Sequence, residues 1–356
     1  MLYSGCAGAL LFQRRQSGDG YSGGMKLRII NKFIKKSLML CCLIAFFINV
    51  EGCSKSKQEG DLKNQQAKKS ANIVAAKYDK NLEAILGDDG LIYEILEDGD
   101  KASMAVATYN DVGLTDIIVP EAVVYEEKEY NVTEIKASAF ESNLLLEKIV
   151  LSKGLERIGE SAFYSCPELK EVVFSDTIKS IGNSCFAECP ELSGIELPSS
   201  LESLGVEVFC NCTSLKKVTI PAKISTIGNA VFYGCESLEE CSFEKGVVQV
   251  AAEMFTNCYK LSKVEIPDTV TTIGTEAFWA CTSLTEIVLP ESITAISDKA
   301  FYSSGIKTLR IPEKVSGVKM EMLEGMEELE EISVPENSKG VYEDLFKNYG
   351  IKITSY

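Results

Sequence analysis

Phenylalanine recurs eight times at one fixed interval of 23 residues, and this period constrains the fold more than any other feature of the sequence. The set comprises Phe140, Phe163, Phe186, Phe209, Phe232, Phe255, Phe278 and Phe301. Smaller apolar residues recur around each of them, and in the turn that starts at Phe255 they are Leu261, Val264, Ile266, Val270 and Ile273. A period of this length is the signature of a solenoid, in which each repeat stacks on the next. We therefore expect one elongated repeat domain rather than several globular ones.

The repeated unit reads LxxIxLPxxLxxIGxxAFxxCxx, as in residues 261–283. Its first segment predicts a short strand whose inward side chains pack on the turns above and below, about 4.8 Å away. The Pro that follows ends the strand ladder because it has no N–H. Each Phe is expected to fill the interior. A recurrent Gly predicts a tight bend with φ above zero, at Gly159, Gly182, Gly205, Gly228 and Gly274.

Two places break the repeat. One turn carries Glu244 and Ala251 in place of the usual Pro and Gly. The stretch after Phe301 is one residue short and places Leu323 at the Phe position. The spacing then recovers, so turns are expected to continue nearly to Tyr356 and the solenoid to occupy residues 140–356.

The segment before the repeats predicts a capping structure of β-strands. Strand patterns cover residues 91–96, 102–109 and 114–120, and Asp98-Gly99 is a hairpin signal between the first two. A solenoid needs such a cap because its end would otherwise expose core side chains and open strand edges. We expect residues 90–139 to form this N-terminal β-hairpin cap and the first repeat.

The region upstream of the cap, residues 54–89, predicts a polar tether that includes a short helix. The sequence just after residue 53 is polar and poor in aromatic residues. Between Asp61 and Leu86, apolar residues fall at helical spacing and a glycine follows; the set is Val74, Tyr78, Leu82, Ile85 and Gly87. A short amphipathic helix is therefore predicted there.

Residues 1–53 have the pattern of an export leader. From Met25, which we interpret as the initiator after an extended start, a basic segment precedes an apolar run of about 13 residues at 38–50. That run is shorter than the roughly 20 residues needed to span a bilayer, which favours a cleaved signal peptide. The sequence VEGC at 50–53 resembles the lipobox of bacterial lipoproteins, which implies lipidation of Cys53. The alternative is a signal anchor in which Cys53 is an ordinary thiol.

Charge and composition exclude several classes of function. The full chain has 36 Lys and Arg against 52 Asp and Glu. Residues 1–53 contain 7 Lys and Arg and 2 Asp and Glu, so the rest of the chain has a net charge of 29 − 50 = −21. So acidic a domain is not expected to bind nucleic acid. The sequence contains no histidine, which removes Ser-His-Asp and Cys-His catalysis and the HExxH metalloproteases. We expect no catalytic residue, no metal and no cofactor.

Six cysteines recur three residues after the Phe of their turn: Cys166, Cys189, Cys212, Cys235, Cys258 and Cys281. One thiol per turn makes a line with a spacing of about 4.8 Å, whereas tetrahedral zinc needs four sulfurs that converge on one point. We expect buried thiols that act as small apolar side chains. Disulfides remain the alternative, above all in the cluster of Cys185, Cys189, Cys210 and Cys212.

A column of outward residues precedes the central apolar residue of each strand: Lys148, Glu171, Gly194, Lys217, Glu240, Lys263, Glu286, Thr308 and Glu331. Their charges nearly alternate, which pairing between neighbouring strands explains without a ligand. Trp279 follows Phe278 directly and is expected to face outward. Our candidate partner-binding residues are Trp279, Lys217, Glu240, Lys263 and Glu286.

The consensus resembles the BspA-like leucine-rich repeat proteins of bacteria over residues 90–356. The resemblance implies a solenoid of short parallel strands, a surface-exposed or secreted location and, in some members, adhesion; it implies no catalytic residues. We therefore expect a lipid-anchored, surface-exposed protein of the cell envelope, at the outer membrane, that binds a protein or glycan partner. The alternatives are a structural envelope lipoprotein without external ligand and an accessory protein that captures glycans.

Overall fold

The computed structural model describes residues 72–110, 113–315 and 319–356. The predicted leader, the lipidation site Cys53 and most of the predicted tether lie outside these residues. The described helices include none that is long and apolar enough to cross a membrane.

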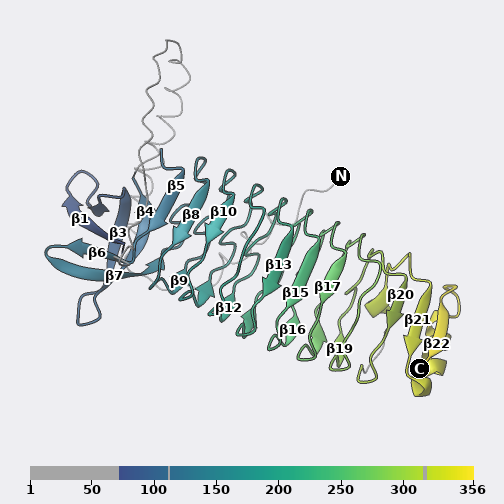
Figure 1. The fold of residues 1–356 in the computed structure, drawn as a ribbon. Helices are drawn as coiled ribbons and strands as arrows, with labels where there is room; N and C mark the ends of the chain where they lie inside the picture. The colour runs from purple at the N-terminus through teal and green to yellow at the C-terminus, as the bar shows by residue number, and fades with distance from the viewer. Residues whose placement is uncertain (1–71, 111–112, 316–318) are drawn as a thin grey trace, which may run out of the picture. The chain divides into compact units, whose positions relative to one another are not determined.

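The repeats form a β-solenoid of about 10 turns with parallel strands, as predicted (Figure 1). The longer strands lie on one side, which we call the strand face, and they form three separate three-stranded parallel sheets. In chain order these strands are β5 (Asp116–Val119), β8 (Lys148–Leu151), β10 (Glu171–Val173), β13 (Lys217–Ile220), β15 (Glu240–Phe243), β17 (Lys263–Glu265), β20 (Thr308–Arg310), β21 (Glu331–Val334) and β22 (Lys352–Ser355).

A second ladder of two-residue strands lies on another side of the solenoid. It consists of β9 (Arg157–Ile158), β11 (Ser180–Ile181), β12 (Ser203–Leu204), β14 (Thr226–Ile227), β16 (Gln249–Val250), β18 (Thr272–Ile273) and β19 (Ala295–Ile296). The ladder is interrupted once, because β14 ends one sheet and β16 begins another. The interruption falls in the turn that carries Ala251 instead of Gly.

The cap is larger than expected and contains no helix where one was predicted. Its strands are β1 (Ile73–Asp79), β2 (Ala84–Gly87), β3 (Leu91–Glu97), β4 (Ser103–Tyr109), β6 (Ala122–Tyr125) and β7 (Lys128–Ile135). The predicted hairpin of β3 and β4 is confirmed, since the two strands pair antiparallel. The helix expected between Asp61 and Leu86 is wrong for the described residues, which form β1 and β2 there.

A turn at Asp79 explains why the apolar spacing misled the helix prediction. One carboxylate oxygen of Asp79 accepts the N–H groups of Asn81 and Leu82, at 2.8 and 3.1 Å. This side-chain turn competes with a helical backbone, and it brings β2 back antiparallel to β1. β1 also pairs in parallel with β6, so tertiary pairing overrides the helical spacing of Val74 and Tyr78.

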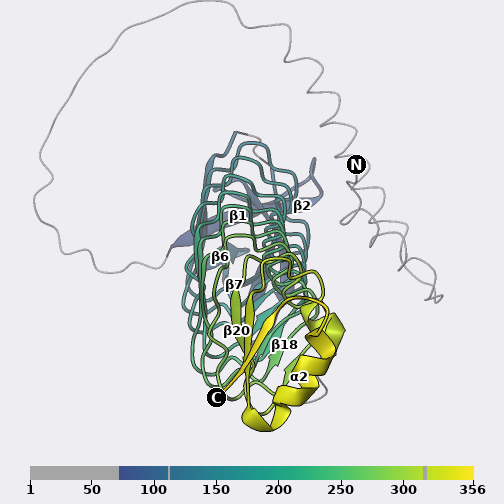
Figure 2. The ribbon, with the colours of Figure 1, turned by 90° about the vertical axis from the view of Figure 1, so that its right-hand side faces the viewer.

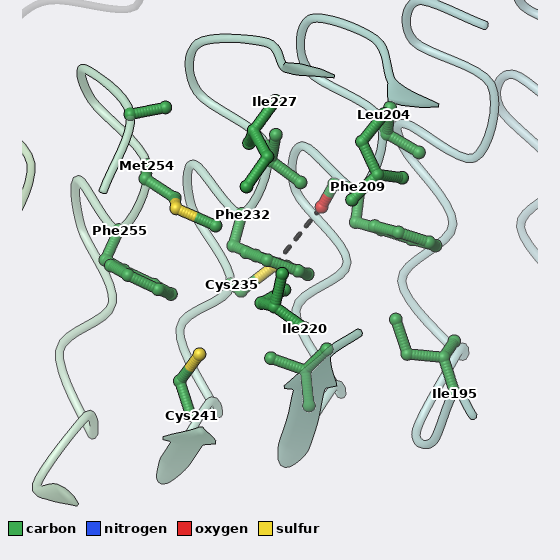
Figure 3. Packing of buried hydrophobic residues seen from close by; sticks show 14 of the residues in the cluster. Ile195, Leu204, Phe209, Ile220, Ile227, Phe232, Cys235, Cys241, Met254 and Phe255 are labelled. Carbon is green, nitrogen blue, oxygen red and sulfur yellow. Dashed lines mark hydrogen bonds between the residues drawn. The ribbon is translucent and has the colours of Figure 1, made fainter. Parts of the chain in front are cut away.

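The Phe residues stack as a continuous column in the core, as predicted. Successive rings lie 5.0 to 5.8 Å apart between centroids and are close to parallel. Figure 3 shows three of them with the aliphatic side chains that surround the rings. At the N-terminal end the ring of Tyr109 in β4 stacks on Phe140 at 5.6 Å, so the cap continues the column.

The recurrent glycines are needed for a different reason from the one predicted. Gly159, Gly182, Gly205, Gly228 and Gly274 do not have positive φ. Each lies instead against the backbone of the preceding turn. A Cβ at Gly159 would stand 2.4 Å from the nitrogen of Ala137, and one at Gly182 would stand 2.5 Å from the nitrogen of Glu160. Close approach of two backbones, rather than bend geometry, explains this column.

Within the repeats, positive φ angles recur two residues before and two residues after each Phe of the column. Around Phe163, for example, Ser161 and Ser165 have φ of 53° and 56°. These left-handed positions are occupied mostly by Ser, Glu, Asn and Ala. Their strain is offset by hydrogen bonds between turns, since the N–H groups of Ser161 and Ser165 donate to Asn183 and Ala187 of the next turn.

The C-terminal end is closed by helical segments. They are the 3-10 helices η3 (Met320–Leu323) and η4 (Glu336–Ser338) and the α-helix α2 (Lys339–Phe346). Figure 2 shows α2 beside the last strands at this end. Tyr342 and Phe346 of α2 are buried, and so is Leu323, which the sequence placed at the Phe position.

Candidate functional site

The outward column of alternating charge exists on the strand face, and part of it pairs as predicted. Successive residues of a strand point to opposite faces, so one in two is outward. Three ion pairs join neighbouring strands in register: Lys148 with Glu171 at 2.9 Å, Lys217 with Glu240 at 2.8 Å, and Lys352 with Glu331 at 2.8 Å. The hydrogen bond and charge of Lys217 lower the pKa of Glu240.

The other charged candidates are arranged differently. Lys263 pairs with Glu265 of its own strand at 2.7 Å instead of with Glu240. Glu286 forms no ion pair among the described residues, and a single isolated bridge joins it to Thr308. Lys217, Glu240 and Lys263 are adjacent on β13, β15 and β17, whereas Glu286 follows the end of that sheet.

Trp279 is half-buried rather than freely exposed, and it does not belong to the strand face. Its indole ring stacks on Tyr302 of the next turn, with 4.2 Å between centroids. The Nζ atom of Lys299 lies 5.9 Å from the indole centroid and 5.7 Å from the Tyr302 ring. One face of the indole is therefore already occupied by an internal contact.

A second outward column, which the sequence analysis did not single out, contains exposed aliphatic side chains. Ile118, Val150 and Val173 stand in register on β5, β8 and β10. Ile118 is 56% exposed and Val173 is 38% exposed, with Val150 half-buried between them. We call these three residues the apolar stripe. The sequence did contain a signal for this stripe. Each of the three residues follows the central, inward apolar residue of its strand, and side chains alternate between inward and outward along a strand.

The strand face opens into a groove next to the apolar stripe. β10 ends one sheet and β13 begins the next, while the turn between them contributes only an isolated bridge from Gly194 to Glu171. This part of the strand face lies between the labels β10 and β13 in Figure 1. The groove has a volume of about 780 Å³. We call it the Gly194 groove, and its lining includes Val173, Phe174, Gly194, Glu196, Leu197 and Lys217.

Gly194 leaves the centre of the groove open because it has no side chain there. Glycine weakens a strand because it has no side chain to pack and loses more backbone entropy on folding. A Cβ at Gly194 would meet nothing within 4 Å, so this position is open. In the described part of the chain, the backbone of Glu196 and Leu197 makes no hydrogen bond to either neighbouring turn. The floor of the groove therefore has free backbone polar groups.

A similar interruption lies further along the solenoid but carries a larger outward side chain in place of the glycine. Residues 286–289 also lack a strand, and they separate β17 from β20. Glu286 stands where the first interruption has Gly194, and Val288 projects with 80% exposure where the first has Glu196. An outward glycine at the interruption is thus specific to the Gly194 turn.

The cysteine column forms a line of buried thiols without disulfides. All nine cysteines of the described residues are reduced and buried, including the cluster of Cys185, Cys189, Cys210 and Cys212. Each of the six periodic thiols donates a hydrogen bond at 3.2 Å to the backbone carbonyl of the Phe in the preceding turn, 26 residues earlier, as Figure 3 shows for Cys235 and Phe209. Burial raises the pKa of the Cys212 thiol to about 12. Such thiols are poor nucleophiles and poor metal ligands.

A metal site and a binding surface make different demands on the described residues. They contain no cluster of three or more His, Cys, Asp or Glu side chains that could hold a metal ion. The strand face instead offers charged pairs, an aliphatic stripe and a groove with open backbone groups.

The repeat pattern matches the description "BspA type Leucine rich repeat region" over residues 133–262 and 248–356, with six copies. These ranges cover more than half of the chain. The chain belongs to this family. The 23-residue turns with their short parallel strands are therefore BspA-type leucine-rich repeats, as the consensus indicated.

Solved structures of other bacterial leucine-rich repeat proteins are similar to this BspA-type chain. A leucine-rich repeat protein from T. pallidum is 25% identical, with 55% of this chain and 89% of that one covered and a TM-score of 0.50. One from Bacteroides ovatus is 27% identical, with a TM-score of 0.60 over 74% of this chain and 66% of that one. No curated protein matches.

Proposed function

We propose that this BspA-type protein is a non-catalytic binding protein that recognises a protein partner through the N-terminal part of its strand face. The apolar stripe carries the proposal. Three aliphatic side chains, Ile118, Val150 and Val173, are held in register on a flat parallel sheet and lead into the Gly194 groove. Contiguous exposed apolar surface with a charged border is typical of protein interaction sites.

A protein partner fits this surface better than a glycan does. The two outward columns of the strand face contain aliphatic, polar and charged residues and no aromatic ring. Ring faces of Trp and Tyr are the usual platforms for flat apolar ligands, whereas aliphatic side chains pack against the interface core of another protein. Beyond Gly194 the second column turns polar, with Thr219, Ser242 and Glu265, before a single exposed aliphatic residue, Val288, so the contiguous apolar part is at the N-terminal end.

The proposed location is the cell envelope, with a lipid anchor at Cys53 and the solenoid exposed at the surface of the outer membrane. The leader pattern and the VEGC sequence support it, together with the acidic charge of the domain. Labelled palmitate should enter the wild-type protein and not the Cys53→Ser variant. Protease added to intact cells should remove the solenoid, and full protection of the solenoid would contradict surface exposure.

A matched pair of variants tests the binding proposal. The full chain is compared with Val173→Glu on the strand face and with Val206→Glu, a valine of similar exposure, 41% against 38%, outside the strand face. Proteins cross-linked to the wild type on intact cells and identified by mass spectrometry should be lost with Val173→Glu and kept with Val206→Glu. An identical set of cross-linked proteins for all three would refute the role of the stripe. Circular dichroism confirms that both variants fold.

A further inference from the structure

A second pocket, with a volume of about 470 Å³, lies between the turn of η3 and the turn that follows α2. Its apolar lining consists of Met320, Leu323, Met326, Phe346, Tyr349 and Ile351, and we call it the Met326 pocket. None of the lining residues belongs to β20, β21 or β22. The pocket is therefore separate from the apolar stripe and from the Gly194 groove.

The Met326 pocket exists because two turns are not held together at this corner. In a regular turn the N–H groups of the Phe and of the residues two before and two after it donate to the next turn, as Ser161, Phe163 and Ser165 do. In the turn of η3, Leu323 occupies the Phe position. The equivalent N–H groups of residues 321, 323 and 325 donate to none of residues 342–350 in the described structure, where α2 replaces a regular turn.

The apolar lining combines a buried part with an exposed aromatic wall. Leu323, Met326 and Phe346 are buried, whereas Tyr349 is 62% exposed. The ring of Tyr349 makes an edge-to-face contact with Phe346, with 6.1 Å between centroids and an interplanar angle of 71°. Concave apolar surface of this kind accepts side chains of a ligand, and the flexible Met side chains adapt to its shape. The pocket therefore suits an aliphatic side chain.

The charged lining of the pocket is acidic. It consists of three carboxylates and no Lys or Arg: Glu321, Glu324 and Glu327. The Nζ atom of Lys299 lies 3.7 Å from a carboxylate oxygen of Glu324. Glu321 and Glu327 form no ion pair among the described residues. The border of the pocket therefore keeps uncompensated negative charge.

The other lysines near the pocket do not line it. Lys307 lies in a neighbouring depression and pairs with Glu330 at 3.9 Å. Lys319 and Lys347 flank the lining residues in sequence, and both are exposed. None of the three stands among the carboxylates of the pocket, and the domain as a whole is acidic. A ligand that carries positive charge is therefore attracted to this border.

We propose that the Met326 pocket binds a basic amphipathic peptide segment of a partner protein, with an aliphatic side chain in the pocket and Lys or Arg beside Glu321 and Glu327. Several carboxylates around one apolar pocket favour a ligand with repeated positive charges, such as a peptide, over a single small cation. Apolar anchors next to basic residues are a common form of peptide recognition. This site is a second one, independent of the strand face.

Matched peptides test the two parts of the recognition. The probe is a labelled ten-residue peptide of Leu and Lys, measured by fluorescence anisotropy with the full chain. Two further peptides carry Glu in place of each Lys, or Ser in place of each Leu. The Leu–Lys peptide should bind at least about tenfold more tightly than either, because each lacks one of the two contributions. Its binding should weaken as salt is added, since exposed charges are screened.

Two pairs of variants test the position of the site. Tyr349→Ala removes the exposed wall, and its control is Val341→Ala, in α2, where the side chain is 57% exposed and does not line the pocket. Glu327→Gln removes a carboxylate of the border, and Glu336→Gln removes the same charge from η4, outside the pocket. Tyr349→Ala should weaken binding at least about fivefold and Glu327→Gln about threefold, with both controls unchanged. Circular dichroism confirms that all four variants fold.

Four results would overturn the inference: no binding of the Leu–Lys peptide, equal binding of its Glu counterpart, unchanged binding by Tyr349→Ala, or the same loss with Glu327→Gln as with Glu336→Gln. The last result would mean that the overall negative charge, and not the pocket, attracts the peptide. Val173→Glu, on the strand face, should leave peptide binding unchanged. The proposed function can therefore fail while this inference holds, and the reverse.

Discussion

Replacement of Gly205 by alanine should break the contact between two turns of the solenoid. A Cβ at Gly205 would stand 2.5 Å from the backbone nitrogen of Asn183 and 2.7 Å from the carbonyl carbon of Gly182. Ordinary van der Waals contact begins at 3.4 Å. Because the obstructing atoms belong to the backbone of the preceding turn, the methyl group can be accommodated only if the two turns separate.

The chain itself shows what such a separation costs in hydrogen bonds. At the Gly205 turn, the N–H groups of residues 202, 203 and 205 donate to the preceding turn at 2.8, 3.1 and 2.9 Å. The equivalent groups at 248, 249 and 251 make no such bond in the described structure, and the strand ladder stops there. Ala251 replaces glycine in this turn, but a Cβ alone does not open the ladder, because Ser297 in the same column keeps the three equivalent bonds to its preceding turn at 2.8, 3.4 and 3.0 Å.

The expected loss of stability follows from these three bonds. At about 1 kcal/mol each, loss of all three bonds in Gly205→Ala should cost at most about 3 kcal/mol. Alanine also restricts the unfolded chain, which returns about 0.4 to 1 kcal/mol. The net destabilisation should therefore reach at most about 2 to 3 kcal/mol, measured by urea denaturation with the fluorescence of Trp279 and with circular dichroism. The slope of the unfolding free energy against urea should stay constant.

Gly194→Ala is the matched control, because a Cβ there meets nothing within 4 Å. It should leave stability unchanged or raise it by up to about 1 kcal/mol. Ala251→Gly separates two causes of the interrupted ladder: stability should rise when the methyl group of Ala251 opens it, and should not rise when the other change in this turn, Glu244 for Pro, does so. Equal midpoints for Gly205→Ala and Gly194→Ala would refute the close-approach explanation.

Further predictions concern the thiol column and the charged column. Cys235→Ser should destabilise by about 1 to 3 kcal/mol, because the shorter side chain leaves a buried hydroxyl without its bond to the Phe209 carbonyl. Ser304 stands in the same column with a buried hydroxyl that has no partner in the described structure, so Ser304→Cys should raise the unfolding midpoint; a lower midpoint would contradict this. In Lys217→Ala the pKa of Glu240 should rise toward its ordinary value, as NMR titration would show, because Lys217 is the main cause of its depression. An unchanged titration would mean that the pair does not persist in solution.

Inward residues were predictable from the sequence because the period fixes them. Each Phe, each Cys three residues later and the strand residues repeat at 23, and stacking requires their burial at every turn. The same period predicted that neighbouring charges such as Lys148 and Glu171 would face each other. At these positions the sequence repeat follows directly from the packing, because each turn must place the same kind of side chain against the next turn.

Features that depend on the neighbouring turn or on distant strands were not predictable in the same way. The glycine column was recognised, but its cause, contact with the backbone one turn earlier, requires the spacing of two turns in three dimensions. The helix expected before the cap was wrong because β1 gains a distant partner in β6, with Ala122 opposite Ile73, while β2 pairs with its neighbours β1 and β3. The Gly194 groove arises from a missing strand, and a single outward glycine gives only a weak signal of that.

The cysteine column gives this protein a built-in set of reporters on its own unfolding. Six thiols, one in each turn from Cys166 to Cys281, are shielded in the same way and bonded in the same way. An alkylating reagent can modify a given thiol only when its turn opens, so the rate at each cysteine measures the opening of that turn. Peptide mapping over time would then show whether the stack unravels from its ends or divides where the ladder is interrupted beside Ala251.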